Sequence, residues 1–143
     1  MDLGLLSCSK TKKKYACKAY EMYSPSPLFR KSYFYATKTY DGVGILSAKY
    51  GFVLPDDHIE PYELTLKRMK KRERLKWAEK AFRQINERLN IKGLTRVFFH
   101  AGEKYREFHI QQFMARGIEC TTPLEGLRFG LQLAWYDRHS TPK

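Results

Sequence analysis

The chain has 143 residues and a net charge of +12; 43% of its residues are hydrophobic and 29% are charged. This balance excludes a disordered chain, and the lack of any apolar run near 18 residues excludes a membrane span. Three cysteines without a CxxC pair argue against a disulfide framework or a cysteine-based zinc site, so we expect a cytoplasmic protein.

The positive charge is combined with many aromatic residues: ten Tyr, nine Phe and two Trp. Lys and Arg neutralise phosphates while aromatic rings stack on bases, so this combination is typical of a protein that binds a polyanion. We therefore expect DNA, RNA or a nucleotide as the partner, with a merely basic surface as the alternative. We expect no cofactor and no metal, because the four His and the scattered carboxylates show no metal-ligand spacing.

Residues 3–6 form a short apolar run that predicts a buried strand almost at the N-terminus. Hydroxyl residues and lysines follow, and they are suited to an anion because hydroxyl and backbone N–H groups donate while ammonium groups neutralise charge. The spacing does not match a P-loop, and a solvated basic loop is the alternative. The candidate substrate-binding residues here are Ser7, Cys8, Ser9, Lys10 and Lys12.

A first helix is predicted to begin at Ser26 and Pro27, which suit the N-cap and the first helical position, and to end near Tyr40. Residues 43–46 predict a second strand. The loop that follows, residues 47–62, is dense in polar groups, and loops on a rigid scaffold often hold binding and catalytic residues. We expect this loop to form one wall of a site.

Lys49 and Glu60 are the candidate catalytic residues of this loop. Lys49 could bind an anion or act as an amine nucleophile, and an ordinary ion pair is the alternative. Glu60 is preferred among the loop carboxylates because Pro61 makes its surroundings rigid. The candidate substrate-binding residues are Ser47, Tyr50, Gly51, Asp56 and Tyr62, of which the two tyrosines could stack on a base or be buried with bonded hydroxyls.

A long helix is predicted from a cap at Thr65 to about Asn90. Residues 67–88 contain ten basic and three acidic residues, a local net charge of +7. A charge run is often only a solvated face, but at this excess we expect phosphate contacts. The candidate nucleic-acid-binding residues are Lys67, Arg68, Lys70, Lys71, Arg72 and Arg74.

Residues 96–101 and 118–121 predict a third and a fourth strand, separated by a helix that ends at Gly117. Thr122 and Pro123 are expected to start a last helix through Tyr136, followed by a frayed tail over residues 138–143. Glu125 is a candidate catalytic carboxylate near that helix start, with capping as the alternative. The candidate substrate-binding residues of this half are Gly102, Glu103, Tyr105 and Gly126.

The order strand-helix, repeated four times, predicts a single α/β domain over residues 1–143. We expect a mostly parallel four-stranded sheet with helices on both faces, a three-layer αβα arrangement. Ligands of open parallel sheets bind beyond the carboxyl ends of the strands. All four predicted strands end in polar residues, so their ends are expected to converge on one site.

Several motifs resemble a family of uncharacterised bacterial, archaeal and phage domains, the domain of unknown function 6884. The shared stretches are residues 7–10, 24–29, 46–51, 55–56, 61–62, 101–105 and 123–127. The Leu-Ser-x-x-Tyr-Gly and Pro-Tyr motifs within residues 46–62 are also similar to the YaaA peroxide-stress family, which is described as DNA-binding. More distantly, the element order is similar to the uracil-DNA-glycosylase-like fold.

These resemblances and the basic composition favour a protein that acts on nucleic acid or a nucleotide, as an N-glycosidase or DNA-glycosylase-like hydrolase of a base. Tyr50 or Tyr62 would stack on the base, and Glu60 or Glu125 would stabilise the sugar cation or orient water. A target base in a duplex would have to be flipped out. The alternative is a non-catalytic DNA-binding or nucleotide-binding module, related to stress or defence.

Overall fold

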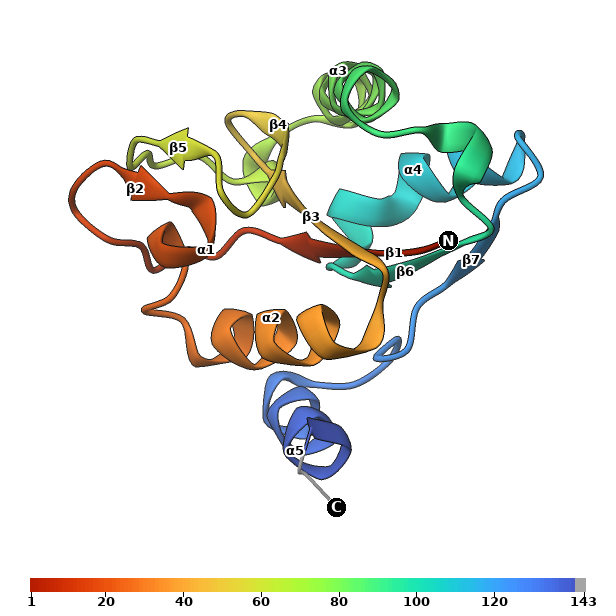
Figure 1. The fold of residues 1–143 in the computed structure, drawn as a ribbon. Coiled ribbons are helices and arrows are strands. Elements are labelled where there is room, and N and C mark those ends of the chain that lie inside the picture. The colour runs from red at the N-terminus through yellow and green to blue at the C-terminus, as the bar shows by residue number, and fades with distance from the viewer. Residues whose placement is uncertain (141–143) are drawn as a thin grey trace.

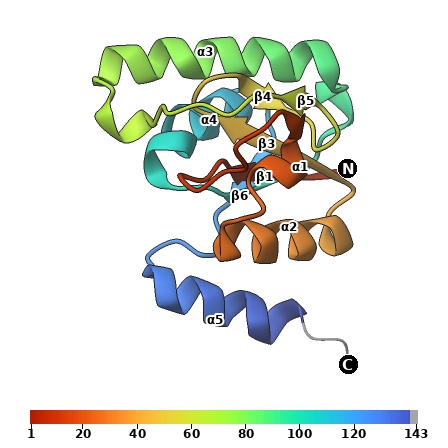
Figure 2. The same ribbon diagram turned by 90° about the vertical axis from the view of Figure 1, so that its left-hand side faces the viewer.

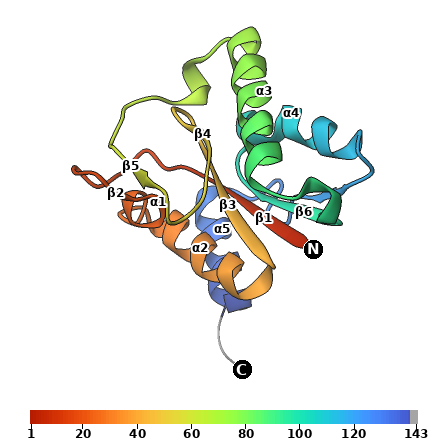
Figure 3. The ribbon, with the colours of Figure 1, turned by 45° about the horizontal axis from the view of Figure 1, so that its top comes forward.

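A five-stranded sheet forms the centre of the computed structural model, which describes residues 1–140 (Figure 1). Its spatial order is β4-β3-β1-β6-β7, and Figure 3 shows β3, β1 and β6 side by side. Four of the strands are parallel, and β4 is antiparallel to β3. The strands are β1 (Asp2–Ser7), β3 (Gly42–Ser47), β4 (Gly51–Val53), β6 (Arg96–His100) and β7 (Glu119–Thr121).

The prediction of four strands is therefore wrong in number, because the sheet has β4 as a fifth strand. β4 lies in the stretch that the sequence indicated as loop. The chain reverses directly after β3, with Gly51 at φ 86° and paired with Ser47. Only glycine adopts this conformation without strain. The four predicted parallel strands are all present, so the sheet is mostly parallel as expected.

Helices cover both faces of the sheet (Figures 1 and 2). One face holds α3 (Lys71–Arg88) and α4 (Glu103–Met114), and the other holds α2 (Pro27–Thr39), against which α5 (Phe129–Ser140) packs. Smaller elements are α1 (Ala19–Met22), the 3₁₀ turns η1 (Leu66–Arg68) and η2 (Ile91–Gly93), and the pair β2 (Cys17–Lys18) and β5 (His58–Ile59). Among residues 1–140 there is no helix with the length and apolar character needed to cross a membrane.

The side chains of β1 alternate between two buried clusters. Leu5 packs with residues of α3 and α4, whereas Leu6 packs with Phe29 and Ala36 of α2. Because both faces of a central parallel strand are covered, its sequence is a continuous apolar run rather than an alternating one. Residues 3–6 have this pattern, which is why the strand was predictable.

Several helix ends differ from their predicted positions. Ser26 caps α2 as expected, with its Oγ accepting from Phe29 N at 3.2 Å. Thr65 caps η1 rather than α3, because a turn separates the two helices. α5 begins at Phe129, six residues after Pro123, and continues to Ser140, so the first part of the expected tail is helical. Residues 141–143 of that tail lie outside the described residues.

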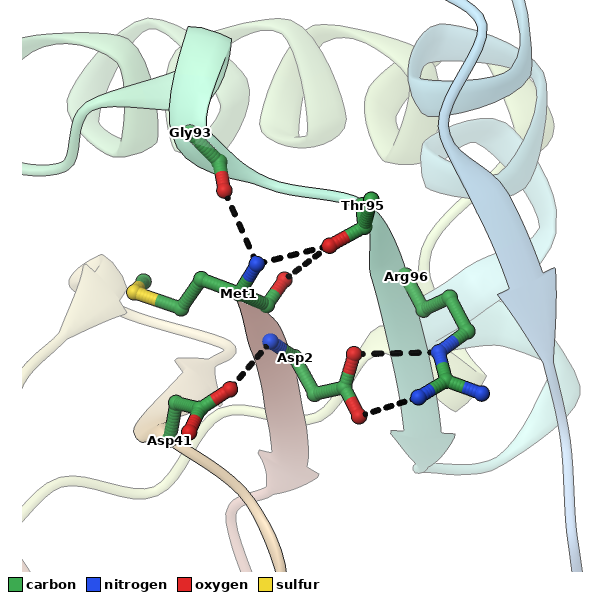
Figure 4. Close-up of polar contacts among 6 residues, drawn as sticks. All are labelled: Met1, Asp2, Asp41, Gly93, Thr95 and Arg96. Atoms are coloured by element: carbon green, nitrogen blue, oxygen red, sulfur yellow. Dashed lines mark hydrogen bonds and ion pairs between the residues drawn. The ribbon is translucent and has the colours of Figure 1, made fainter.

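The amino end of the sheet is closed by polar contacts among β1, β3 and β6 (Figure 4). The Met1 ammonium group donates to Gly93 O at 3.0 Å and to Thr95 Oγ1 at 2.6 Å. The Arg96 guanidinium makes two bonds to the Asp2 carboxylate, at 3.0 and 2.8 Å. Side chains at this edge are thus paired with one another, and the opposite, carboxyl edge holds the cleft described next.

Candidate functional site

A cleft of about 1750 Å³ lies at the carboxyl ends of β1, β6 and β7. Such edges collect ligands because the loops that follow several parallel strands meet there. Its wall combines the ends of these three strands with the start of α2 and the segment around η1. The lining residues come from segments 7–12, 26–29, 62–69, 99–107 and 122–129, together with Ser32, Glu73, Gln132 and Tyr136.

More than half of the predicted site residues line this one cleft. They come from the strand ends of β1, β6 and β7, from η1, and from the far end of the loop after β3. Of the residues proposed for catalysis, only Glu125 is among them. The full set is Ser7, Cys8, Ser9, Lys10, Lys12, Tyr62, Lys67, Arg68, Gly102, Glu103, Tyr105, Glu125 and Gly126.

The end of β3 does not reach the cleft, because β4 turns the chain back along the sheet. Lys49 is exposed with its Nζ 5.3 Å from the centre of the Tyr50 ring, and Glu60 is exposed on the same loop. The cleft-lining part of the loop begins only at Tyr62. The predicted residues outside the cleft are Lys49, Glu60, Ser47, Tyr50, Gly51, Asp56, Lys70, Lys71, Arg72 and Arg74.

Several of these outlying residues have structural contacts. Gly51 lies against Gln84, whose side chain accepts from Phe52 N at 2.8 Å and so joins α3 to β4. Asp56 forms a surface ion pair with Lys18 at 3.9 Å. Arg74 is half-buried and bonded to Glu107 at 3.1 Å. Arg74 is thus less available to a phosphate than its exposed neighbours.

Tyr62 is held in the cleft wall by two other hydroxyl groups. Its OH lies 2.8 Å from the OH of Tyr23 and 2.8 Å from Oγ of Ser47. Ser47 is fully buried and its Oγ also accepts from Tyr50 N at 3.1 Å. Burial raises the pKa of both Tyr23 and Tyr62 above the usual value of a phenol, so both remain protonated at neutral pH.

Lys12 reaches from the β1 end onto this wall. Its Nζ lies 4.5 Å from the centre of the Tyr62 ring and donates to Lys10 O at 3.3 Å. Partial burial lowers the pKa of Lys12, because removal from water disfavours the ammonium ion. The Tyr62 ring therefore positions a cation, and a base that stacked on the same ring face would have to displace it.

Cys8 lies between β1 and the start of α4. Its backbone N–H donates to Leu46 O at 2.9 Å, and its thiol lies 3.5 Å from the OH of Tyr105. Burial raises the pKa of Tyr105. These contacts hold the half-buried Cys8 side chain in the cleft wall, beside the Tyr105 phenol.

Two predicted carboxylates lie on the cleft. Glu103 is the first residue of α4, directly after Gly102 at the N-cap, where the helix dipole favours an ionised side chain. Glu125 is 72% exposed and lies 3.8 Å from Arg106, which itself donates to Ala101 O at 2.8 Å. Among residues 1–140, no three His, Cys, Asp or Glu side chains are grouped as metal ligands.

Sequence reasoning missed a buried histidine on the cleft wall. His100 Nε2 lies 2.6 Å from the OH of Tyr40, and Nδ1 lies 2.6 Å from the OH of Tyr136. Burial lowers the pKa of His100 to about 4, so the ring is neutral at pH 7. The signal was its place at the end of a predicted strand, but its two partners are distant in the sequence, one at the end of α2 and one within α5.

Two exposed apolar side chains at the cleft were also missed. Leu64 precedes η1 and is 44% exposed, and Phe129 begins α5 and is 59% exposed. Neither had a signal in the sequence, because Leu64 fell in an expected loop and Phe129 inside an expected helix.

A comparison with protein-family models matches residues 3–138 to a family of unknown function, DUF6884. The chain belongs to this family. No curated protein and no solved structure matches it. For this DUF6884 chain, the similarities to the YaaA peroxide-stress family and to the uracil-DNA-glycosylase-like fold therefore stay predictions from short motifs and element order.

Proposed function

We propose that this DUF6884 protein acts on nucleic acid or a nucleotide as an N-glycosidase that hydrolyses the bond between a base and its sugar. The observation that supports this is the content of one cleft. Lysines suited to phosphate and carboxylates suited to a sugar cation share it. The three-layer αβα arrangement is part of this proposal, because such folds bind ligands at the carboxyl edge of the sheet.

The roles follow from position on the cleft. Lys10 and Lys12, from the end of β1, hold phosphate oxygens. The C1′–N bond breaks first, and the charge of Glu125 stabilises the resulting sugar cation. Glu125 then accepts a proton from the water that attacks C1′ and forms the C1′–O bond. Glu103 supplies a second carboxylate, fixed at the start of α4. The departing base takes its proton from solvent.

Purified protein is incubated with single-stranded oligonucleotides containing each base, and released base is measured by chromatography. Glu125→Gln is expected to lower the rate by about 10²- to 10⁴-fold, the usual effect of losing a general base. Glu60→Gln, outside the cleft, is the matched control and is expected to resemble the unmodified protein. Absence of base release, or equal rates for the two variants, would contradict the proposal.

A non-catalytic binding module is the second candidate, and a specific observation favours it. Glu125 is largely exposed, while burial raises the pKa of Tyr62 above the usual value of a phenol and lowers the pKa of His100 to about 4. At pH 7 Tyr62 is therefore a neutral phenol and His100 a neutral imidazole, and neither is poised to change its protonation state. Salt-sensitive binding to nucleic acid without base release would select this function.

A further inference from the structure

We infer that the cleft receives a single-stranded segment of nucleic acid several nucleotides long, with a base stacked on Phe129, rather than a free nucleotide. The inference rests on the proposed function for the class of ligand and adds its form and a contact residue. Four features of the described residues support it: the size of the cleft, its apolar rim, its unpaired cations and the surface of α3.

The cleft is larger than one nucleotide needs. Its volume of about 1750 Å³ exceeds the roughly 300–1,000 Å³ that is usual for small-molecule sites. It is also open, with walls from five separate segments of the chain. A strand of several nucleotides can fill a cleft of this size, whereas a mononucleotide would leave most of the cleft filled with water.

The rim of the cleft exposes an aromatic ring. Phe129 is 59% exposed at the start of α5, and Leu64 is 44% exposed before η1. These two segments lie on the same side of the molecule, above and below the loop after β1 (Figure 2). Exposed apolar groups beside many cations are suited to bases that are free of a duplex, because every base has a flat apolar face.

The cations of the cleft are available to phosphates. Lys10, Lys67, Arg68 and Lys104 line it, and none forms an ion pair with another described residue. Arg106 is the exception, since it lies near Glu125. Several unpaired cations spread over one cleft match a chain of phosphates better than the one to three phosphates of a free nucleotide.

The positive surface continues from the cleft along α3. Glu73 in its first turn lines the cleft, and the helix then runs away from it. Basic residues recur on its outer face at successive turns, opposite the buried Ala78, Ala81 and Phe82. They are Arg72, Lys76, Lys80 and Arg83, all exposed and without an ion pair to any residue of 1–140.

The length of the basic stripe on α3 favours a strand of several nucleotides over a free nucleotide as the ligand. From Arg72 to Arg83 the helix rises about 17 Å, at 1.5 Å per residue. A free nucleotide bound in the cleft cannot reach its far end, but a longer strand can. A duplex could place its phosphates along the basic residues of α3, but it could not stack a base on Phe129, because paired and stacked bases do not offer their faces to a side chain.

The test measures binding of labelled oligo-dT of 2, 4, 8 and 16 nucleotides, of a 16-base-pair duplex, and of dTMP as competitor, by fluorescence anisotropy. We expect affinity to rise at least tenfold between 2 and 8 nucleotides, and single strands to bind more tightly than duplex. Phe129→Ala is expected to weaken binding of the 8-mer by about 5- to 150-fold, the usual range for loss of one stacking ring.

Phe34→Ala is the matched control, since Phe34 is 47% exposed on α2 and does not line the cleft. The double variant Lys80→Glu, Arg83→Glu should weaken the 16-mer but not the 2-mer. The inference is overturned if dTMP or the 2-mer binds as tightly as the 8-mer, or if Phe129→Ala and Phe34→Ala behave alike. Base release is measured separately, so binding without release refutes only the proposed hydrolysis.

Discussion

The hydroxyl of Tyr62 lies 2.8 Å from Oγ of Ser47, across fifteen residues of the loop that follows β3. This bond joins the start of that loop to its end. Ser47 is buried at the end of β3, while Tyr62 lies in the cleft wall with the Lys12 ammonium group over its ring. The loop thus contributes to the cleft through one tyrosine, which Ser47 and Tyr23 hold in place.

Tyr62→Phe is expected to destabilise the fold. It removes two hydrogen bonds and leaves the buried hydroxyls of Tyr23 and Ser47 without this partner, at a cost of about 1–3 kcal/mol. Urea unfolding measures the change. Tyr50→Phe is the control, because within residues 1–140 the Tyr50 hydroxyl forms hydrogen bonds only with the backbone of Glu60, at 3.2 and 3.4 Å near the surface. Equal stability of the two variants would contradict this account of the network.

The sequence predicted β1, β3 and β6 because each contains a short apolar run. It did not predict β4, which has three residues, too few for a recognisable period, and begins at Gly51, a residue type typical of turns. It also placed the start of the last helix too early. Pro123 suits a first helical position, but Gly126 has φ 82°, a turn conformation, and the helix follows at Phe129.

The candidate site was predictable in part, because parallel strands must present their carboxyl ends at one edge. The ends of β1, β6 and β7 meet as expected, and Ser9 and Glu125 line one cleft. The order of the strands in the sheet explains why the end of β3 does not join them. β3 lies on the far side of β1 from β6, and β4 extends the sheet there, so Lys49 is outside the cleft. No local pattern encodes strand order, nor the pairing of His100 with tyrosines from distant helices.

Stability is expected to fall as the pH drops from about 6.5 to about 4. Burial lowers the pKa of His100 and of His109 from 6.5 to about 4 in the folded chain. Between these values the unfolded chain binds protons that the folded chain does not, which favours unfolding by up to roughly 3 kcal/mol per histidine. The free energy of unfolding, measured in urea at pH 4.5, 5.5, 6.5 and 7.5, should show this slope.

Substituting one histidine at a time separates the contributions of His100 and His109 to this pH dependence. His109 Nδ1 lies 2.7 Å from Gln112 Oε1, and its Nε2 is buried with no hydrogen-bond partner among the described residues, so a second proton there would be unpaired. His109→Gln should remove about half of the slope, whereas His58→Gln, at an exposed position, should leave it unchanged. If the unfolding free energy still falls to the same extent as the pH drops when both His100 and His109 are replaced by Gln, the assignment of this pH dependence to the two histidines is refuted.

Gly44→Ala is expected to destabilise the sheet by about 1–3 kcal/mol, as overpacking of a core does. A methyl group at Gly44 of β3 would overlap the Phe52 ring of β4 and approach Leu5 Cδ2 at 3.2 Å. Gly42→Ala in the same strand is the control, because its nearest side-chain atoms lie at ordinary contact distances of 3.6 and 3.7 Å. Thermal unfolding of the pair measures the difference, and equal midpoints would show that β4 does not pack as described.

Lys12, rather than Lys49, is expected to bind phosphate. Lys12→Ala should reduce the slope of log K against log salt for single-stranded DNA by about 0.7, the value for one lost phosphate contact, and Lys49→Ala should leave it unchanged. The pKa of Lys12 is lowered by burial from 10.5, and only the protonated amine binds phosphate. Affinity should therefore decline at a lower pH in the unmodified protein than in Lys12→Arg, which stays charged. Anisotropy titrations between pH 7 and 10 measure the affinity of the two proteins for single-stranded DNA. If both show the same dependence on pH, the phosphate does not contact Lys12.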